Sequence, residues 1–204
     1  MRIEILSLEQ KKLLSLLKSF NNEYYLVGGT AIALHLGHRR SIDFDLFTEK
    51  ELKFRAIENH VKRNKFDIEQ VFNRTIDEFT FITNGVKLSF VSFPFNIKAD
   101  ENFNNIIRIP NLLILAAMKA YALGRRSKWK DYIDMYFILH DHFSIELISA
   151  EAERIFQGSF NSRLFREQLI WFENMDFSET VDFTKGYEVS DTEVKKFLLK
   201  VVTK

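Results

Sequence analysis

The stretch LVGGTAIALHLGHRRSIDFDLF, residues 26–47, decides the fold expected of this chain. It begins as an apolar strand that Gly28 and Gly29 interrupt, and the segment after the glycines is typical of a brief helix. Alternating apolar residues around Asp43 and Asp45 then predict a second strand. This order of strand, turn, helix and strand would bring the glycine turn and the two aspartates to one place.

The glycine turn has the features of an anion site. A residue without a side chain lets a phosphate approach the backbone, and the N–H groups at a helix start point toward that anion. The hydroxyl of Thr30 would add a further donor. A Gly-Gly pair by itself is more often a plain turn. The assignment of Gly28, Gly29 and Thr30 to phosphate binding therefore depends on the residues that accompany them.

Asp43 and Asp45 are the residues that support a binding site at the glycine turn. Residues two positions apart on a strand face the same side, so the two carboxylates should converge, with Ile42, Phe44 and Leu46 on the buried side. Like charges repel unless a cation lies between them, and Mg²⁺ prefers oxygen ligands. The alternative is a solvated polar face on an edge strand. Because the pair follows a glycine turn, we favour a joint phosphate and metal site.

The composition is that of an ordinary globular protein. Of the 204 residues, 46% are hydrophobic and 28% charged, and the net charge of +1 creates no overall field toward nucleic acid or membrane. The absence of cysteine excludes disulfides and thiolate metal sites. The amino terminus lacks the apolar core of a signal peptide, and no stretch approaches the ~18 apolar residues of a membrane span. We expect a cytoplasmic protein without a membrane partner.

The chain divides into two unlike parts, which predicts an α+β protein. Residues 1–104 should form an α/β subdomain and residues 105–204 a helical subdomain, and the two should share a cleft. Strands are expected at residues 24–27, 42–47, 65–72, 79–82 and 86–93, with Asn84-Gly85 as a hairpin turn. Helices are expected at residues 7–20, 30–36, 48–64, 110–123, 129–140, 144–156, 161–174 and 190–203.

Helix boundaries carry their own signals. Ser7 with Gln10, and Thr48 with Glu51, have the spacing of capping boxes. Pro110 suits the first position of a helix, and Gly124 suits its carboxyl-terminal stop.

A second informative stretch is AAMKAYALGRRSKWKDYIDMYFIL, residues 116–139. Lys119 lies in an otherwise apolar helix, where its stem can snorkel along the apolar surface. Asp131 and Asp134 lie three positions apart on one helix face, and Asp131 could simply complement the helix dipole. Trp129 and Tyr132 are expected to be packing residues.

Basic residues gather between these two helices. They are Arg125, Arg126, Lys128 and Lys130. A solvated basic loop is the usual explanation of such a run, and a grip on nucleotide phosphates or RNA backbone is the functional one.

The two stretches, in this order, resemble the nucleotidyltransferase (polymerase β-like) superfamily and, more narrowly, the AbiEii/AbiGii toxin family of nucleotidyltransferases. The resemblance implies a mixed sheet with flanking helices followed by a helical subdomain. It implies metal-dependent transfer from a nucleoside triphosphate (NTP), in some characterised relatives to the acceptor end of tRNA. It also implies the toxin of a toxin–antitoxin pair of phage-defence type, with an antitoxin as cognate partner.

These considerations yield one set of site residues. The predicted catalytic residues are Asp43, Asp45, Lys119 and Asp131. The predicted nucleotide-binding residues are Gly28, Gly29, Thr30, Arg125 and Lys130. The predicted ligands of Mg²⁺ or Mn²⁺ are Asp43 and Asp45. The resemblance implies that the charge of Lys119 meets the triphosphate, and it makes Asp131 a candidate for orienting Lys119 or the substrate.

The chain departs from the superfamily pattern at Ser89. Active members commonly place a third carboxylate on a later strand, and here the equivalent segment carries a hydroxyl, which is a poorer metal ligand. Glu69, Asp100 and Glu101 are possible substitutes that the sequence does not place. The departure keeps open an alternative, a catalytically inactive nucleotidyltransferase-fold binding module.

Overall fold

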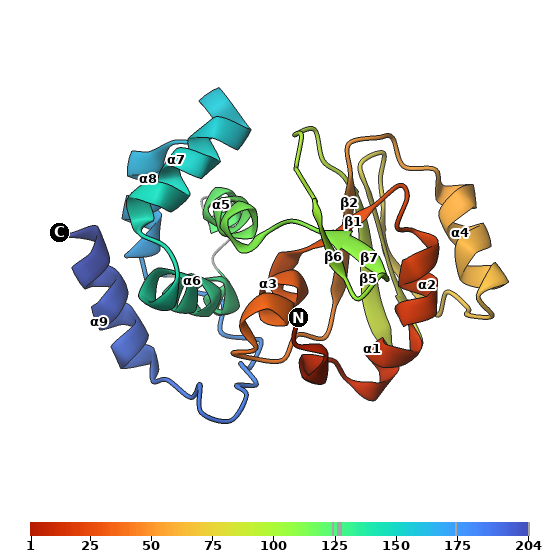
Figure 1. The fold of residues 1–204 in the computed structure, drawn as a ribbon, viewed down its shortest axis with the longest axis horizontal. Helices are drawn as coiled ribbons and strands as arrows, with labels where there is room; N and C mark the ends of the chain where they lie inside the picture. The colour runs from red at the N-terminus through yellow and green to blue at the C-terminus, as the bar shows by residue number, and fades with distance from the viewer. Residues whose placement is uncertain (124, 126–127, 174, 204) are drawn as a thin grey trace. The chain divides into compact units, whose positions relative to one another are not determined.

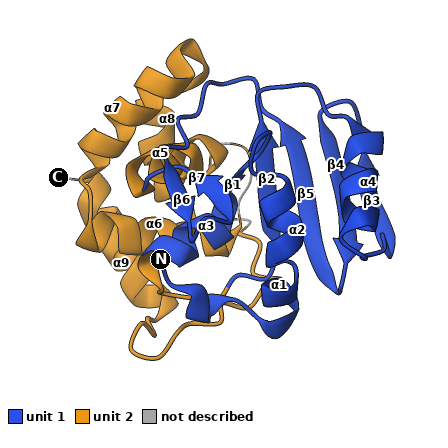
Figure 2. Ribbon diagram, turned by 45° about the vertical axis from the view of Figure 1, so that its right-hand side comes forward, with its two compact units in different colours: residues 1–35, 41–111 blue, residues 36–40, 112–204 orange. Residues whose placement is uncertain are grey.

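The computed structural model describes residues 1–123, 125, 128–173 and 175–203, and it confirms an α+β fold. The chain forms two compact units (Figure 2). We call Met1–His35 with Ser41–Asn111 the sheet unit, and Leu36–Arg40 with Leu112–Lys204 the helical unit. The sequence placed the division at residue 104, whereas the structure places it at Asn111 and assigns Leu36–Arg40 to the helical unit. Hydrophobic periodicity could not predict this assignment, because Leu36–Arg40 is too short a segment to show a periodic pattern.

The described part of the sheet unit contains a seven-stranded mixed sheet of order β3-β4-β5-β2-β1-β7-β6. Its strands are β1 (Tyr25–Val27), β2 (Phe44–Thr48), β3 (Gln70–Arg74), β4 (Glu78–Thr83), β5 (Val86–Ser92), β6 (Glu101–Phe103) and β7 (Ile107–Ile109). Strand β2 is central, antiparallel to β1 and parallel to β5. Its Phe44 and Leu46 are fully buried, as the alternating pattern predicted.

Helices cover this sheet within the same unit. They are α1 (Leu8–Lys12), α2 (Leu14–Ser19), α3 (Gly28–Leu36) and α4 (Phe54–Arg63), with a 3-10 turn at Ile3–Ile5. Phe20, which follows α2, packs on His60 of α4 and on Phe90 of β5. Helices α2 and α4 therefore cover one face of the sheet, and Figure 1 shows α3 on the other side.

Several local predictions are confirmed. The capping box of Ser7 and Gln10 opens α1, although the expected long helix forms as two segments that meet at Leu13. Asn84 and Gly85 join β4 to β5 with positive φ angles of 50° and 68°. Both angles suit a tight hairpin turn.

Other boundaries were predicted wrongly. Thr48 ends β2 and does not cap a helix, because α4 begins at Phe54 after Lys53. The pairing of β2 with β5 extends to Thr48 and keeps it in the sheet. Ile42 lies before β2 and is 64% exposed, so the prediction that it faces the core was wrong. Strand β3 starts at Gln70, after a turn at Lys65 with a φ of 63°.

The described part of the helical unit is built from five α-helices and one 3-10 turn. They are α5 (Leu112–Leu123), α6 (Trp129–Asp141), α7 (Ile145–Phe156), η2 (Gln157–Ser159), α8 (Ser162–Leu169) and α9 (Asp191–Val202). Pro110 lies two residues before α5 rather than in its first turn, and Gly124 is outside the described residues. Helix α8 ends at Leu169, five residues earlier than predicted.

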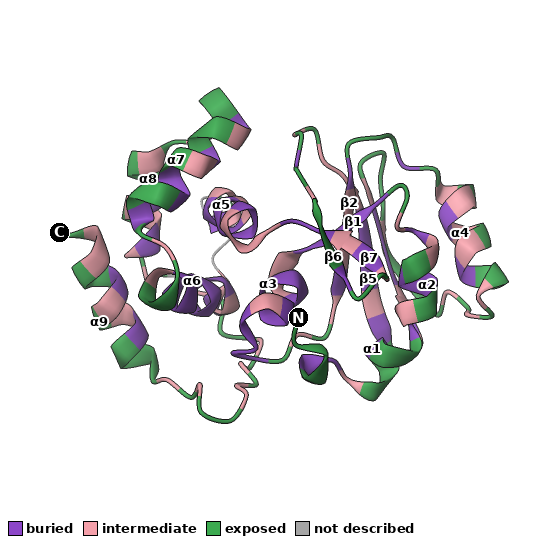
Figure 3. Ribbon diagram, viewed as in Figure 1, coloured by how far each residue is buried: buried purple, intermediate pink, exposed green. Residues whose placement is uncertain are grey.

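Side-chain caps and apolar faces explain these helices. Ser144, Asn161 and Ser190 each accept a hydrogen bond from a backbone N–H of the first turn of α7, α8 and α9. Helix α5 packs against α6, α7 and α8, and α6 packs against α9. Buried residues run along α5 and α6, whereas α9 has an exposed side (Figure 3). In the part of the chain that the structure describes, no helix is long and apolar enough to cross a membrane.

Candidate functional site

Gly28 and Asp45 are in direct contact at the end of β1. Val27 pairs with Asp45 across the two antiparallel strands, and α3 starts at the next residue. Gly28 has a φ of 73°, and a Cβ built on it would lie 2.2 Å from Oδ2 of Asp45. The backbone at Gly28 can therefore approach the carboxylate only because this residue has no side chain.

Asp43 lies just before β2 and is held by two other residues. Its carboxylate Oδ2 is 2.7 Å from Nζ of Lys87 on β5. Its backbone carbonyl accepts a hydrogen bond from the hydroxyl of Thr30, which is 1% exposed. That hydrogen bond uses the hydroxyl proton that the sequence analysis assigned to a phosphate. Thr30 thus positions the segment that carries Asp43.

Ser89 lies in register beside Asp45 on the neighbouring strand β5. This is the position at which the superfamily pattern predicts a third acid, and the predicted adjacency of Ser89 and Asp45 is confirmed. Its proposed substitutes are elsewhere. Glu69 accepts a hydrogen bond from the backbone of Gly85 at the hairpin, and Asp100 is bound to Lys98. In the residues that the structure describes, no group of three or more histidine, aspartate or glutamate side chains could hold a metal.

The arrangement around Gly28 fits a divalent cation and a polyphosphate. The carboxylate of Asp45 lies beside Gly28, in the space that a Cβ of this residue would fill, and the carboxylate of Asp43 lies two residues earlier on the same chain segment. Helix α3 begins at Gly28, so the N–H groups of its first turn lie there. Carboxylate oxygens suit Mg²⁺ or Mn²⁺, and the N–H groups of a helix start suit phosphate oxygens. The sheet unit thus provides two protein carboxylates, and a substrate would have to supply further ligands.

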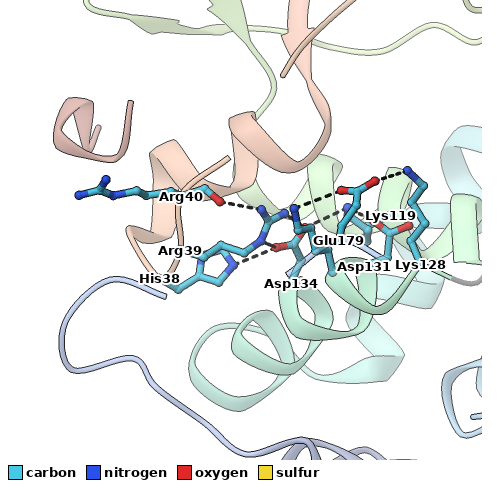
Figure 4. A network of polar contacts seen from close by, with 9 residues as sticks. His38, Arg39, Arg40, Lys119, Lys128, Asp131, Asp134 and Glu179 are labelled. Carbon is cyan, nitrogen blue, oxygen red and sulfur yellow. Dashed lines mark hydrogen bonds and ion pairs between the residues drawn. The ribbon is translucent and has the colours of Figure 1, made fainter. Parts of the chain in front are cut away.

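The helical unit contains a buried network of charged residues centred on Asp134 (Figure 4). Oδ1 of Asp134 accepts from Nε of Arg39 at 2.7 Å, and Oδ2 accepts from Nη2 of Arg39 at 2.9 Å. Nζ of Lys119 lies 2.9 Å from Oδ2 of Asp134 and 2.6 Å from Oδ1 of Asp131. These two acids balance the charges of Arg39 and Lys119. Burial raises the pKa of Asp134, but Arg39 and Lys119 outweigh it and hold that pKa well below its usual range.

Lys119 is therefore neither a snorkelling residue nor an exposed one. Lys119 is 4% exposed, and its ammonium lies between two carboxylates of α6. Asp131 and Asp134 share a helix face, as predicted, and Asp131 orients Lys119 at 2.6 Å. The packing role of Trp129 and Tyr132 is confirmed by their burial.

His38 completes the network as a neutral side chain. Its Nε2 lies 2.9 Å from Oδ1 of Asp134, and its Nδ1 is buried without a hydrogen-bond partner among the described residues. Burial lowers the pKa of His38 despite the opposing effect of the Asp134 carboxylate. The ring thus donates from Nε2–H to Asp134 in its uncharged form.

The predicted nucleotide-binding cations of the helical unit have partners of their own. Lys128 and Lys130 contact the two carboxylate oxygens of Glu179 at 2.6 and 3.1 Å. The hydrogen bond from Lys128, reinforced by that from Lys130 and opposed by partial burial, lowers the pKa of Glu179 to about 2. Arg125 donates to the carbonyl of Tyr121 and lies 3.6 Å from the centroid of its ring. Arg126 lies outside the described residues.

Sequence reasoning missed residues that complete both groups. These are His38, Arg39, Lys87, Asp134 as the centre of a network, and Glu179. The pair Arg39-Arg40 carried a weak signal, since two arginines follow the glycine that ends a helix. Glu179 carried none, because it lies in an irregular segment far along the chain.

Comparisons with known proteins identify relatives of this chain. The family model described as nucleotidyl transferase AbiEii toxin, type IV TA system, matches residues 13–114, half of the chain. The matched segment contains Gly28, Asp43, Asp45 and Ser89. The protein aq_aa25 of Aquifex aeolicus (strain VF5), described as uncharacterized, is 32% identical over 123 residues. That match covers 59% of this chain and 60% of the relative, which is less than two thirds of the relative's length.

Solved structures share the fold. MenT4, a nucleotidyltransferase toxin from Mycobacterium tuberculosis H37Rv, has a TM-score of 0.59 and 13% identity over 95% of this chain and 80% of its own. A candidate nucleotidyltransferase from H. pylori has a TM-score of 0.58 and 16% identity over 96% of this chain and 93% of its own. At these identities the likeness concerns the fold alone.

The contact between Gly28 and Asp45 makes a first prediction. Gly28→Ala should lower the free energy of unfolding by about 1–3 kcal/mol through backbone strain, and it should displace the Asp45 carboxylate. Urea unfolding measures the stability. Gly158→Ala is the control, because Gly158 has open space around its Cβ position and should shift stability by no more than about 0.5 kcal/mol. Equal stabilities of the Gly28 variant and the wild type would contradict the described contact.

Lys119→Met should be strongly destabilising. Removing the ammonium leaves Asp131 and Asp134 buried with less compensation, and breaking a buried ion pair typically costs about 3–5 kcal/mol. The apolar character of helix α5 alone would predict that methionine is tolerated at this position, but the ion pairs of Lys119 reverse that prediction. Exposed Lys200→Met on α9 is the control. A melting temperature of Lys119→Met equal to that of the control would show that the network contributes nothing to stability.

His38 predicts a pH dependence of stability. Because the folded-state pKa is lowered, the contribution of His38 is complete above the unfolded-state pKa and declines as pH falls below about 6.5. His38→Gln keeps a donor and removes the titration, so its unfolding free energy should fall less steeply below pH 6.5, by up to about 1.4 kcal/mol per pH unit. Urea unfolding between pH 7.5 and 5.5 measures both slopes, with exposed His142→Gln alongside. Identical slopes for wild type and His38→Gln would refute the prediction.

Proposed function

Since the chain belongs to the nucleotidyl transferase AbiEii toxin family of type IV toxin–antitoxin systems, we propose that it transfers a nucleotide from an NTP to an RNA acceptor such as tRNA. The observation that carries the proposal is the approach of Gly28 to the carboxylate of Asp45 inside the matched segment. The fold shared with nucleotidyltransferases supports it. A cognate antitoxin is the protein partner we propose, and the cytoplasm is the expected compartment.

Mg²⁺ or Mn²⁺ is the proposed cofactor, with Asp43 and Asp45 as its protein ligands. The Asp45 carboxylate lies at the glycine turn, and the hydrogen bond from Thr30 fixes the backbone of Asp43 two residues earlier. When bound, the ion would neutralise triphosphate charge and polarise the α-phosphorus. The protein itself holds the reacting groups in position. Asp45 is held in register by β1 and β5, and the N–H groups of Gly28 and Gly29 lie in the first turn of α3, where a helix start suits phosphate oxygens.

The reaction we propose is an in-line displacement. A hydroxyl of the acceptor attacks the α-phosphorus and forms a new P–O bond. The bond between the α-phosphorus and the oxygen that bridges it to the β-phosphorus breaks, and pyrophosphate leaves with that electron pair. The hydroxyl proton passes to solvent. The fixed carboxylates and the backbone of the turn lower the barrier by holding the triphosphate in place.

In the helical unit we propose supporting roles for Lys119, Asp131, Arg125 and Lys130. The ammonium of Lys119 is a fixed positive charge that Asp131 orients. Lys130 already binds Glu179, so a phosphate oxygen would have to compete with that carboxylate for it. Arg125 is exposed and its guanidinium lies over the ring of Tyr121, which also stacks on Phe156, so the guanidinium is the group that a base or phosphate can contact.

Ser89 favours a second candidate function. A hydroxyl beside Asp45 reduces the number of protein ligands for metal, which suits a module that binds nucleotide without transferring it. Such a module would bind an NTP in the presence of Mg²⁺ and leave RNA unmodified.

Labelled NTPs incubated with the protein, Mg²⁺ and total RNA test the proposal. We expect label to appear in RNA with the wild type and not with Asp45→Asn, because the amide is a weaker metal ligand than the carboxylate. Asp67→Asn is the matched control, since Asp67 is exposed before β3 and should keep full activity.

Binding measurements separate the two candidate functions. If calorimetry shows that the protein binds NTP but no label enters RNA in the transfer assay, the inactive module is supported. Equal activity of the wild type and Asp45→Asn would reject the metal site. Circular dichroism of each variant confirms that a lost activity does not reflect a lost fold.

A further inference from the structure

Four polar residues adjoin one another, three on one face of the sheet and Asp43 just before β2. Asp45 on β2 is in register with Ser89 on the parallel strand β5. Asp43 lies two residues before Asp45, and Lys87 lies two residues before Ser89. Nζ of Lys87 is 2.7 Å from Oδ2 of Asp43. Alternate residues of these strands, Phe44 and Leu88, are fully buried on the other face. Two acids on one segment thus adjoin an ammonium and a hydroxyl on the next.

Stability alone does not account for the pair of Lys87 and Asp43. The Lys87 side chain is 37% exposed and that of Asp43 is 28% exposed. Ion pairs of this exposure contribute about 0–1 kcal/mol. Their position is the informative feature, because Lys87 contacts one of the two carboxylates assigned to metal binding.

Charge and ligand number argue against two divalent ions at this position. Ions of two-metal sites lie about 3.5–4 Å apart and need carboxylates that bind both. In the described residues, no third acid joins Asp43 and Asp45. The ammonium of Lys87 offsets one of the two negative charges of Asp43 and Asp45, so it weakens the attraction that these carboxylates exert on a second divalent ion.

We propose that Lys87 takes the place of a second divalent cation, so that this site binds a single Mg²⁺ while the Lys87 ammonium neutralises Asp43. The inference rests on the proposed function, because it uses the assignment of Asp43 and Asp45 to a metal site. Lys87 acts through Asp43 and is therefore a positioning residue. It supplies a permanent positive charge where a third acid and a second ion would otherwise be needed, which explains how Ser89 is compatible with activity.

Counting bound Mn²⁺ tests this inference without measuring catalysis. Electron paramagnetic resonance and calorimetry, with a non-hydrolysable NTP analogue present, should give one Mn²⁺ per wild-type chain. Combining Lys87→Met with Ser89→Asp removes the ammonium and adds a carboxylate, and this double variant should bind two. Circular dichroism checks that the double variant is folded.

The single variant Lys87→Met gives an independent result. Without nucleotide, its affinity for Mn²⁺ should rise about tenfold, equivalent to about 1.4 kcal/mol, because the competing cation is gone. Lys87→Arg should restore the wild-type affinity and keep one ion. Lys98→Met is the matched control, since it removes an exposed partner of Asp100 and should leave the affinity unchanged.

The outcomes distinguish this inference from the proposed function. Two Mn²⁺ ions on the wild type, or an unchanged affinity of Lys87→Met, would overturn the role of Lys87 and leave nucleotidyl transfer intact. One ion and the tenfold shift would support the role of Lys87 even if RNA labelling failed, and that failure would count against the proposed function alone.

Discussion

The space beside the carboxylate of Asp45 has room for a backbone but not for a side chain, and the arrangement of the sheet unit follows from this constraint. Gly28 fills that space with a positive φ, and the chain changes there from strand β1 to helix α3. The strand that returns, β2, lies between β1 and β5 and brings Asp45 into register with Ser89. One close contact thus joins the turn suited to phosphate and the acid suited to metal.

A second constraint acts in the helical unit, where Asp134 has no access to water. A buried carboxylate is stable only when cations and donors surround it. Arg39 and Lys119 provide the cations and His38 provides a neutral donor. Arg39, which its ion pair with Asp134 holds within the helical unit, lies four positions before Asp43 in the sequence. Lys119 and Asp131 are therefore structural as well as candidate functional residues.

The sequence predicted what depends on local chemistry. It identified the turn at Gly28, the strand around Asp45 and the hairpin at Asn84, because each has a specific backbone or periodic requirement. The prediction was wrong where pairing between distant strands determines the secondary structure. Thr48 is an example, because it pairs with Ser92 of β5 and does not cap a helix. The sequence could not place Lys87 or Glu179, since nothing in their neighbours in sequence specifies which carboxylate or ammonium they meet in space.

Crystals of the wild-type protein grown with Mn²⁺ and a non-hydrolysable NTP analogue would test the central claim most directly, by anomalous scattering. We expect a manganese peak in contact with the carboxylates of Asp43 and Asp45, with phosphate oxygens of the analogue completing the coordination near the backbone of Gly28. A manganese peak bound elsewhere on the chain, or an analogue whose phosphates lie away from the glycine turn, would contradict it.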